Sequence, residues 1–308
     1  MNQYQIRRLT RDDIGDLRDL IKICFKANLG LDELEAKYGT RQFFSKDPIG
    51  YFALNEQGLP VAYYGVFPIY MQIGNGKVLC AQSGDTMTHP QHTGKGLFTL
   101  LAKQTYETAL AEGIECIFGF PNKNSFPGFI KKLNWVQTGT MTNFTLPVKT
   151  IPLQKVPKVF KPAYFVTRPW TKVILQQKVQ ENFEFEDQNN YPRILHDKNF
   201  FGYKTGNDSV WLKCGKIKIF VKLNLWFIIG FIDKPELLGI NETNAIKKLA
   251  ALLGFDKIFY SCSDNHPSLP FVSKFFNQEE GLPVCWLNNS RLEELKKAIF
   301  TSADFDTF

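Results

Sequence analysis

The sequence predicts a mixed α/β (α+β) fold, in which a central sheet is flanked by helices and is followed by a second lobe of similar build. Three observations lead to this fold class. Strand-like alternation and helix-like periodicity take turns along residues 1–146. A glycine-rich turn at residues 91–96 separates a predicted strand from a predicted helix. A helix–strand–helix pattern around Gly113 recurs around Gly254, which indicates an internal repeat.

The first elements follow from alternation, capping and turn chemistry. Residues 4–9 alternate as a strand does, and Asp12-Asp13 then begin a helix with apolar side chains every three or four residues. Two hairpins follow, one turning at residues 55–58 and the other at Gly74-Asn75-Gly76. The last strand of the second hairpin leads into the glycine-rich turn.

The elements after that turn complete the first lobe. A helix begins at about Gly96 and ends at Gly113, because glycine suits the left-handed position after a helix. Residues 114–120 read as a buried strand, and a second helix over 125–133 precedes a strand over 136–146. The predicted order is strand, helices, three strands, helix, strand, helix, strand.

A turn suited to phosphate binding reads Gln91-His92-Thr93-Gly94-Lys95-Gly96. Glycines at alternate positions permit positive φ and leave no Cβ between the backbone and a ligand. Successive N–H groups can then converge on an anion beside a helix N-terminus, and Lys95 adds a positive charge. A Walker A loop is excluded because His89 stands where a glycine is required. A dinucleotide fingerprint is excluded because its third glycine is replaced by Thr99.

Directly after a strand, this turn resembles the acyl-CoA loop of the GNAT acyltransferases, Q/R-x-x-G-x-G/A. A second resemblance follows the next strand, where Asn122-Lys123-Asn124-Ser125 is similar to the family's Asn-x-x-Ala. Asn134-Trp135 stands for the family's Gly-Phe, with one residue inserted before it. Phe129 occupies the position of a tyrosine that in the family often protonates the leaving CoA thiolate. We interpret Phe129 as a core residue.

The resemblance implies acetyl-CoA as co-substrate, with no metal. A backbone N–H of the fourth strand would polarise the thioester carbonyl, the glycine turn would take the pyrophosphate, and an asparagine after the fifth strand would meet the pantetheine arm. The cofactor-binding residues that it implies are Thr86, Met87, Thr88, Gln91, His92, Thr93, Gly94, Lys95, Gly96, Leu97, Phe98, Asn122 and Asn124.

Two residues are candidates for proton transfer. Asp85 directly precedes the polarising segment and is the carboxylate best placed to act as a base, directly or through water. A structural, hydrogen-bonded role after Ser83-Gly84 is the alternative for this side chain. Ser125 is the candidate proton donor in place of the missing phenol. The histidines show no metal-ligand spacing, and no G-x-S-x-G elbow supports a hydrolase.

Three domains are expected. Residues 1–146 form a GNAT-like acyl-CoA-binding domain, residues 147–180 a basic, proline-containing linker, and residues 181–308 a degenerate GNAT-like lobe that completes the acceptor pocket. Residues 233–237 stand where the second lobe would carry its own loop, and they contain no glycine pair. The second lobe is therefore predicted to lack a cofactor site.

The expected function is transfer of an acetyl group from acetyl-CoA to an amine or hydroxyl of a small-molecule or sugar acceptor. A pocket near Tyr63, Tyr64 and Phe67 would suit a sugar or an aryl amine, whereas the basic segment after residue 146 would suit a nucleotide or a glycan. One alternative is a non-catalytic GNAT-like protein that binds acyl-CoA, which the missing tyrosine permits. The other is an aminoacyl transferase of the tandem-lobed peptidoglycan type, which would use charged tRNA.

Composition limits the partners and the compartment. The net charge of +7 favours anionic ligands, but no recognised module for nucleic acid accompanies it. Six scattered cysteines without a C-x-x-C pair indicate neither zinc nor a disulfide framework. The N-terminus lacks the apolar core of a signal peptide, and the most apolar run, 217–232, is too short to span a bilayer. We interpret that run as buried strand and expect a cytoplasmic protein without a membrane partner.

Overall fold

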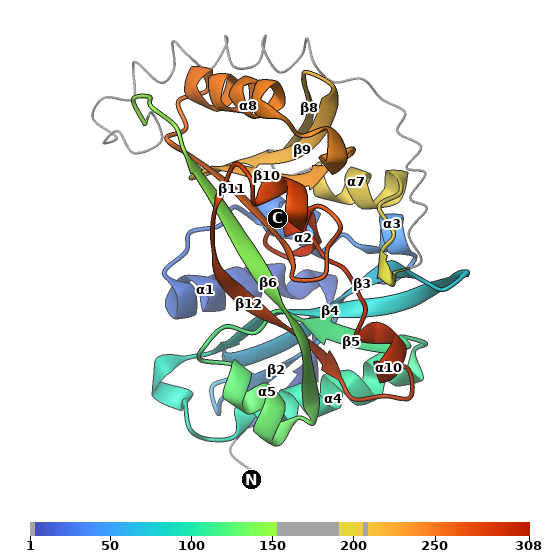
Figure 1. Cartoon of the computed structure of the whole chain (residues 1–308). Helices are drawn as coiled ribbons and strands as arrows, with labels where there is room; N and C mark the ends of the chain where they lie inside the picture. Colours follow the sequence, from blue (N-terminus) through green and yellow to red (C-terminus); the bar gives the residue numbers. More distant parts are fainter. Residues whose placement is uncertain (1–3, 153–190, 206–208) are drawn as a thin grey trace. The chain divides into compact units, whose positions relative to one another are not determined.

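The computed structural model describes residues 4–152, 191–205 and 209–308 (Figure 1). They form a mixed α/β fold with a mixed sheet flanked by helices, as the sequence predicts. The chain divides into two compact units, and the boundary falls within two strands, β6 (Trp135–Pro147) and β12 (Asn277–Leu287). Of the described residues, the first unit holds 4–138, 191–203 and 283–298, and the second holds 139–152, 204–205, 209–282 and 299–308.

The first unit is built on a sheet in the order β1-β2-β3-β4-β5-β12. Its strands β1 to β4 are antiparallel, whereas β5 is parallel to β4. Its elements are β1 (Gln5–Arg8), α1 (Ile14–Phe25), α2 (Leu31–Tyr38), α3 (Arg41–Phe44), β2 (Ile49–Leu54), β3 (Pro60–Ile73), β4 (Gly76–Thr88), α4 (Leu97–Ala111), β5 (Cys116–Gly119), α5 (Phe126–Lys132), β7 (Arg193–Ile194), most of α7 (Lys198–Lys204) and α10 (Leu292–Leu295). The order predicted for the first lobe is confirmed through β6.

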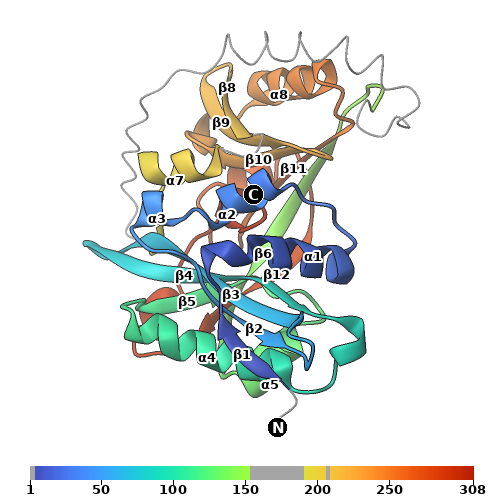
Figure 2. The same ribbon diagram turned by 180° about the vertical axis from the view of Figure 1, so that it is seen from behind.

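Helices cover both faces of this sheet (Figure 2). Leu17 and Leu20 of α1 pack with Tyr63 on one face, and Leu101 of α4 packs with Tyr64 on the other. Adjacent strand residues point to opposite faces, so these two tyrosines cannot line one pocket. Both are also almost fully buried, at 1% and 0% exposure. The expectation that Tyr63 and Tyr64 together form an acceptor surface is therefore wrong.

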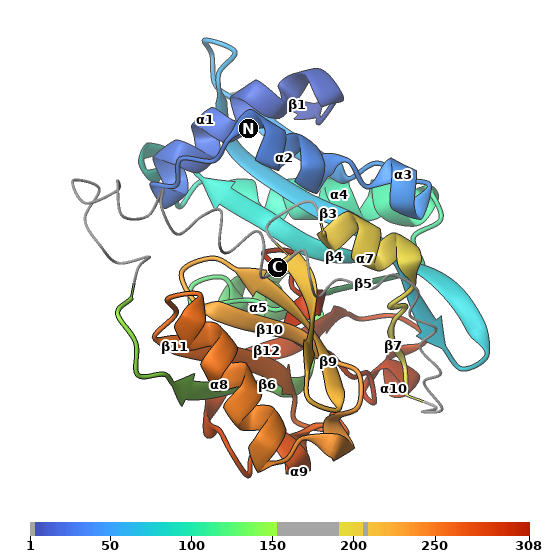
Figure 3. The same ribbon diagram turned by 90° about the horizontal axis from the view of Figure 1, so that it is seen from above.

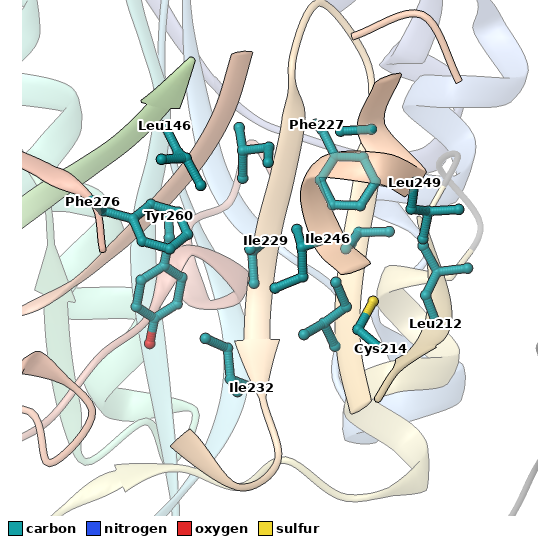
Figure 4. Packing of buried hydrophobic residues seen from close by; sticks show 14 of the residues in the cluster. Leu146, Leu212, Cys214, Phe227, Ile229, Ile232, Ile246, Leu249, Tyr260 and Phe276 are labelled. Carbon is teal, nitrogen blue, oxygen red and sulfur yellow. The ribbon is translucent and has the colours of Figure 1, made fainter. Parts of the chain in front are cut away.

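The second unit has the strand order β6-β11-β10-β9-β8, with α8 lying across the sheet (Figure 3). Strands β10 and β11 are parallel, and α8 connects them. Its elements are β8 (Ser209–Cys214), β9 (Ile217–Leu223), β10 (Phe227–Ile232), α8 (Ile240–Leu252), β11 (Lys257–Ser263) and α9 (Leu269–Val272). In Figure 4, Ile246 of α8 lies beside Ile229 of β10 in the core of this unit.

The two halves of the chain share one element order. Among the described residues, both halves contain three antiparallel strands (β2–β4 and β8–β10), then a long helix, a strand parallel to the third, a short helix and a last strand. Gly113 and Gly254 occupy equivalent places after the long helix, with φ of +90° and +77°. The last strands are exchanged, because β12 pairs with β5 and β6 pairs with β11. This order is consistent with the repeat inferred from the sequence, which stays a proposal.

The remaining expectations concern residues outside the core of the first unit. The apolar run 217–232 is confirmed as buried strand, because it forms β9 and β10. Among the described residues, no helix has the length and apolar character needed to cross a membrane. Of the predicted basic linker 147–180, only the part up to residue 152 lies within the described residues.

Candidate active site

Strands β4 and β5 separate partway along β4. Their last paired residues are Gln82 and Phe118, while β4 continues to Thr88 and β5 ends at Gly119. Past Gln82, no strand in the described part of the chain pairs with this edge of β4. The backbone groups along that edge are therefore available to a ligand that lies as an extra strand.

A β-bulge lies at the start of the unpaired stretch. Tyr63 pairs with Met87 and Gly65 pairs with Gly84, so β4 holds one more residue than β3 between these pairs. Asp85 adopts a left-handed conformation at the bulge, with φ of +49°. Aspartate tolerates this left-handed conformation better than most residues do. The bulge, and not the regular strand, sets the backbone conformation at Asp85.

The bulge turns the Asp85 carboxylate toward α2. Its Oδ1 accepts from Lys37 Nζ at 2.7 Å, and its Oδ2 accepts from the Tyr38 hydroxyl at 2.9 Å. The Lys37 and Asp85 side chains are 15% and 14% exposed, so this is a largely buried ion pair. Burial, and then the charge of Asp85, raises the pKa of Tyr38 well above its usual range. The phenol is therefore neutral and donates to the carboxylate.

The sequence does not mark Lys37 or Tyr38 as site residues. The helix that carries them begins after Gly30, with acidic residues in its first turn and Lys37 in its last. That charge order agrees with the helix dipole and could have indicated the helix. Its contact with β4 depends on tertiary packing, which local patterns do not encode.

The direction of the backbone groups at the end of β4 follows from one hydrogen bond. The N–H of His89 donates to the carbonyl of Val61 on β3 at 2.8 Å. Because backbone groups alternate in direction along a strand, the N–H and C=O of Thr88 point away from β3, toward the unpaired edge. One of the three residues predicted to polarise the thioester, Thr88, thus presents its N–H on that edge. The side chain of Met87 is buried.

The glycine turn has the predicted conformation. Gly94 and Gly96 have φ of +76° and +78°, and a Cβ built on either would meet no atom within 4 Å. Both glycines are therefore required by the backbone, while the space above them is open. The N–H of Leu100 donates to the carbonyl of Gly96, so the N–H groups of residues 97–99 lie in the first turn without a helical acceptor.

The loop before the glycines is held by three contacts. The Tyr4 hydroxyl lies 2.8 Å from His92 Nδ1, and Lys95 Nζ lies 5.6 Å from the centre of the Tyr4 ring. The Thr93 hydroxyl donates to the carbonyl of Pro90 at 3.0 Å. Partial burial, and then the charge of Lys95, lowers the pKa of His92. The loop therefore combines one exposed cation with a neutral imidazole.

Asn122, Asn124 and Ser125 form a turn after β5. Asn122 Oδ1 accepts from the N–H groups of Asn124 and Ser125 at 2.9 Å and 3.1 Å. The Ser125 hydroxyl lies 3.3 Å from both Asn122 oxygens. The side-chain oxygen of Asn122 thus accepts hydrogen bonds within the turn. Its side-chain –NH₂ is left to donate to a ligand. The assignments of these three residues stay predictions.

Phe129 is a core residue, as predicted. It is 4% exposed, and its ring centre lies 4.5 Å from that of Trp135 and 5.3 Å from that of Phe98. Phe98 also lies against Gly128, where a Cβ would come within 2.8 Å of its ring. Phe98, assigned to cofactor binding from the sequence, is therefore in large part a packing residue of this helix pair.

Part of the chain matches a known protein family. The family described as the acetyltransferase (GNAT) domain matches residues 5–137. This part of the chain is therefore similar to the GNAT acetyltransferase domain. It contains the β4 bulge, the glycine turn and α5. No curated protein matches the chain by sequence.

Solved structures show the same fold over most of the chain. A putative acetyltransferase from Pyrococcus horikoshii has a TM-score of 0.56 at 16% identity, covering 96% of this chain and 93% of that one. A GCN5-related N-acetyltransferase from Kribbella flavida has a TM-score of 0.54 at 11% identity, covering 92% and 71%. At these identities the likeness concerns the fold alone. It extends past the GNAT domain into the second half of the chain.

Proposed function

We propose that the protein is a GNAT-type acyltransferase that moves an acetyl group from acetyl-CoA to an amine or hydroxyl of a small-molecule or sugar acceptor. The observation that carries this proposal is the arrangement of three features within the GNAT domain. The unpaired edge of β4 begins at the Asp85 bulge and leads directly to the glycine turn and the N-terminus of α4. An extended pantetheine on that edge would deliver its pyrophosphate to the turn.

The site residues then take the following roles. Thr88 would present its N–H to the thioester carbonyl, and the N–H groups around Gly94 and Gly96 would hold the pyrophosphate, with Lys95 supplying charge. Such fixed donors stabilise charge that develops on the carbonyl oxygen in the transition state. The –NH₂ of Asn122 would meet the pantetheine arm. The chemistry requires no metal.

Asp85 is proposed as the group that receives a proton from the acceptor. Both of its oxygens already have donors, so an acceptor ammonium would compete with Lys37 for the carboxylate. This arrangement supports an amine acceptor, because a cation fits where Lys37 now lies. The same saturation, together with the missing phenol at Phe129, is the observation that favours the second candidate, a GNAT-like protein that binds acyl-CoA without transferring it.

The glycine turn gives the test of the cofactor proposal. Asparagine tolerates the left-handed conformation, so Gly94→Asn keeps the backbone but places a side chain where the phosphate would approach. CoA affinity should fall about ten- to a hundredfold, since a hydrogen bond to a charged group contributes about 1.5–3 kcal/mol. Gly58→Asn is the matched control, because Gly58 also has φ of +76° and open space, in the β2–β3 turn.

Isothermal titration calorimetry with CoA reads the result. Normal binding by Gly58→Asn and weak binding by Gly94→Asn would support the site. Equal affinity in the two variants would remove the turn from the cofactor site. The protein is then incubated with acetyl-CoA and a panel of aryl amines, sugar amines and polyamines. Only a transferase releases free CoA thiol in an amount that depends on the acceptor, so this assay separates a transferase from a binding protein.

The choice of acceptors and the cellular compartment complete the proposal. A glucosamine N-acetyltransferase region of a fungal multi-domain β-N-acetylglucosaminidase has a TM-score of 0.51 at 12% identity, covering 92% of this chain and 38% of that one. A sugar amine is therefore included among the acceptors to be tried. All six cysteines are free thiols, which is consistent with a reducing, cytoplasmic location.

A further inference from the structure

A chain of polar groups crosses the core between β3, β4, α4 and β6. Trp135 Nε1 donates to the Tyr106 hydroxyl at 3.1 Å, the Tyr106 and Tyr64 hydroxyls lie 2.6 Å apart, and the Tyr64 hydroxyl lies 2.7 Å from Ser83 Oγ. The three inner residues are 3%, 6% and 0% exposed. Ser83, at the outer end, is half-buried. The chain therefore runs from the core to a single partly exposed hydroxyl.

The hydrogens of this chain have a preferred direction. An indole N–H can only donate, so the Tyr106 oxygen is an acceptor for Trp135. If Tyr106 then donates to Tyr64 and Tyr64 donates to Ser83, every buried hydrogen has an acceptor. In the opposite direction the Tyr106 hydrogen would be buried without one, which costs about 1–3 kcal/mol. The Ser83 oxygen is thus an acceptor from Tyr64, and its own hydrogen points outward.

Ser83 lies where β4 and β5 begin to separate. It follows the last paired residues, Gln82 and Phe118, by one position on β4. A Cβ built on Gly119, the last residue of β5, would come within 3.3 Å of the Ser83 Cβ. Because Gly119 has no side chain, nothing from β5 covers this position. The outward hydrogen of Ser83 is therefore available at the narrow end of the unpaired β4 edge.

The chain also passes beside the residue that lacks a phenol. The Phe129 ring centre lies 4.5 Å from that of Trp135 and 6.3 Å from that of Tyr64. The hydroxyls of this region thus come from β3, β4 and α4, whereas the α5 residue contributes only apolar surface. Burial raises the pKa values of Tyr64 and Tyr106, so both phenols keep their hydrogens at neutral and moderately alkaline pH.

We propose that the Ser83 hydroxyl is the hydrogen-bond donor to the sulfur of acyl-CoA, held in that direction by Tyr64, Tyr106 and Trp135. This rests on the proposed function. When the acceptor amine adds to the thioester carbonyl and the C–S bond breaks, the electron pair goes to sulfur. Ser83 stabilises the resulting thiolate by a charge-assisted hydrogen bond. The thiolate then takes up, through solvent, a proton equivalent to the one that the amine has lost, which gives free CoA and an amide.

The test needs no acceptor, because a donor to the thiolate lowers the pKa of the thiol of bound CoA. CoA should therefore bind more tightly as the pH rises from 7 to 9.5, whereas desulfo-CoA, which has no thiol, should not. A lowering of the thiol pKa by one unit gives a gain of about tenfold in affinity. Calorimetric titrations of the full chain with CoA and with desulfo-CoA at each pH measure the difference.

Variants assign that difference to Ser83. Ser83→Ala should abolish the gain of CoA over desulfo-CoA at pH 9.5, and Ser83→Thr, which restores a hydroxyl, should recover it. The matched control is Thr108→Val, because Thr108 Oγ1 makes a similar contact with the Tyr51 hydroxyl at 2.9 Å on another part of α4. Tyr64→Phe should give an intermediate gain, since Ser83 keeps its hydrogen but loses the group that orients it.

The outcomes separate this inference from the proposed function. Equal pH dependence for CoA and desulfo-CoA in the unmodified protein, with binding of both, would overturn the role of Ser83 and leave the cofactor site standing. A gain that persists in Ser83→Ala would also overturn it. Binding of neither ligand would overturn the cofactor site, and the role of Ser83 with it.

Discussion

At the scale of single residues, the site depends on side chains whose neighbours come from distant parts of the chain. Asp85 is predictable from the sequence, because it directly precedes the segment expected to polarise the thioester. Lys37, 48 positions away, is not, although it forms an ion pair with Asp85 at 2.7 Å. A carboxylate paired with a largely buried ammonium differs chemically from a free one, because the pair must part, or share its proton, before the carboxylate acts as a base.

Replacing Asp85 tests its role. Asp85→Asn keeps a residue that tolerates φ of +49° and removes the charge. Acetyl transfer to an acceptor found in the panel should slow by about 10²-fold or more, the usual contribution of a general base, while CoA affinity is unchanged. Asp47→Asn is the control, because Asp47 is likewise paired with cationic side chains, Arg11 and Arg41, and lies outside the proposed site. An Asp85→Asn enzyme with normal kcat would limit this carboxylate to holding α2.

For single helices, strands and turns, local sequence patterns predict several elements correctly. The glycine turn was predicted from glycine spacing and is found with positive φ at Gly94 and Gly96. The helix after it, the buried strand and α5 were predicted from periodicity and capping, with boundaries within a few residues. The bulge at Asp85 was not, because Gly84 and Asp85 lie inside an otherwise regular alternation. Its extra residue is specified by the pairing with β3.

The loop between β4 and α4 should make CoA binding depend on pH. His92 has a lowered pKa in the free protein, through burial and Lys95. A bound pyrophosphate would favour the imidazolium, so binding should take up a proton at pH values between the lowered pKa of His92 in the free protein and its higher pKa in the complex. Affinity gained from protonated His92 is then present at low pH and lost as the pH rises through its pKa in the complex.

Calorimetry in buffers of different ionisation enthalpy counts the protons taken up by this loop. Comparison with His92→Asn isolates the imidazole from the phosphates of CoA, and Asn keeps an acceptor for the Tyr4 hydroxyl. Identical proton uptake by the two proteins would show that His92 does not face the pyrophosphate.

In the whole molecule, the compact units are not continuous stretches of the sequence. Residues 1–146 were expected to be a domain, yet the first unit includes residues 283–298, and β12 supplies the strand next to β5. Trp286, fully buried, has its ring centre 5.2 Å from that of Phe118. The sequence does not indicate that β12 pairs with β5, because pairing across such a separation depends on the packing of the whole unit.

Truncation tests this arrangement. A chain of residues 1–146 would lack β12 and would leave the apolar edge of β5 and the Phe118 ring without cover. We expect it to aggregate or to melt without cooperativity, because an uncovered strand edge pairs with other chains. Thermal unfolding followed by circular dichroism, with the full chain alongside, measures this. A soluble fragment with a cooperative transition would contradict the dependence on β12.

We propose that each chain holds one acyl-CoA site, within the residues that match the GNAT domain. The second half has Asp233 and Glu236 where a second loop would lie, and Gly239 before α8 has φ of −119°, unlike Gly96 before α4. Calorimetric titration with acetyl-CoA counts the sites. We expect a stoichiometry of one per chain in the unmodified protein, and greatly weakened binding in Gly94→Asn. A stoichiometry of two, or full binding by Gly94→Asn, would contradict it.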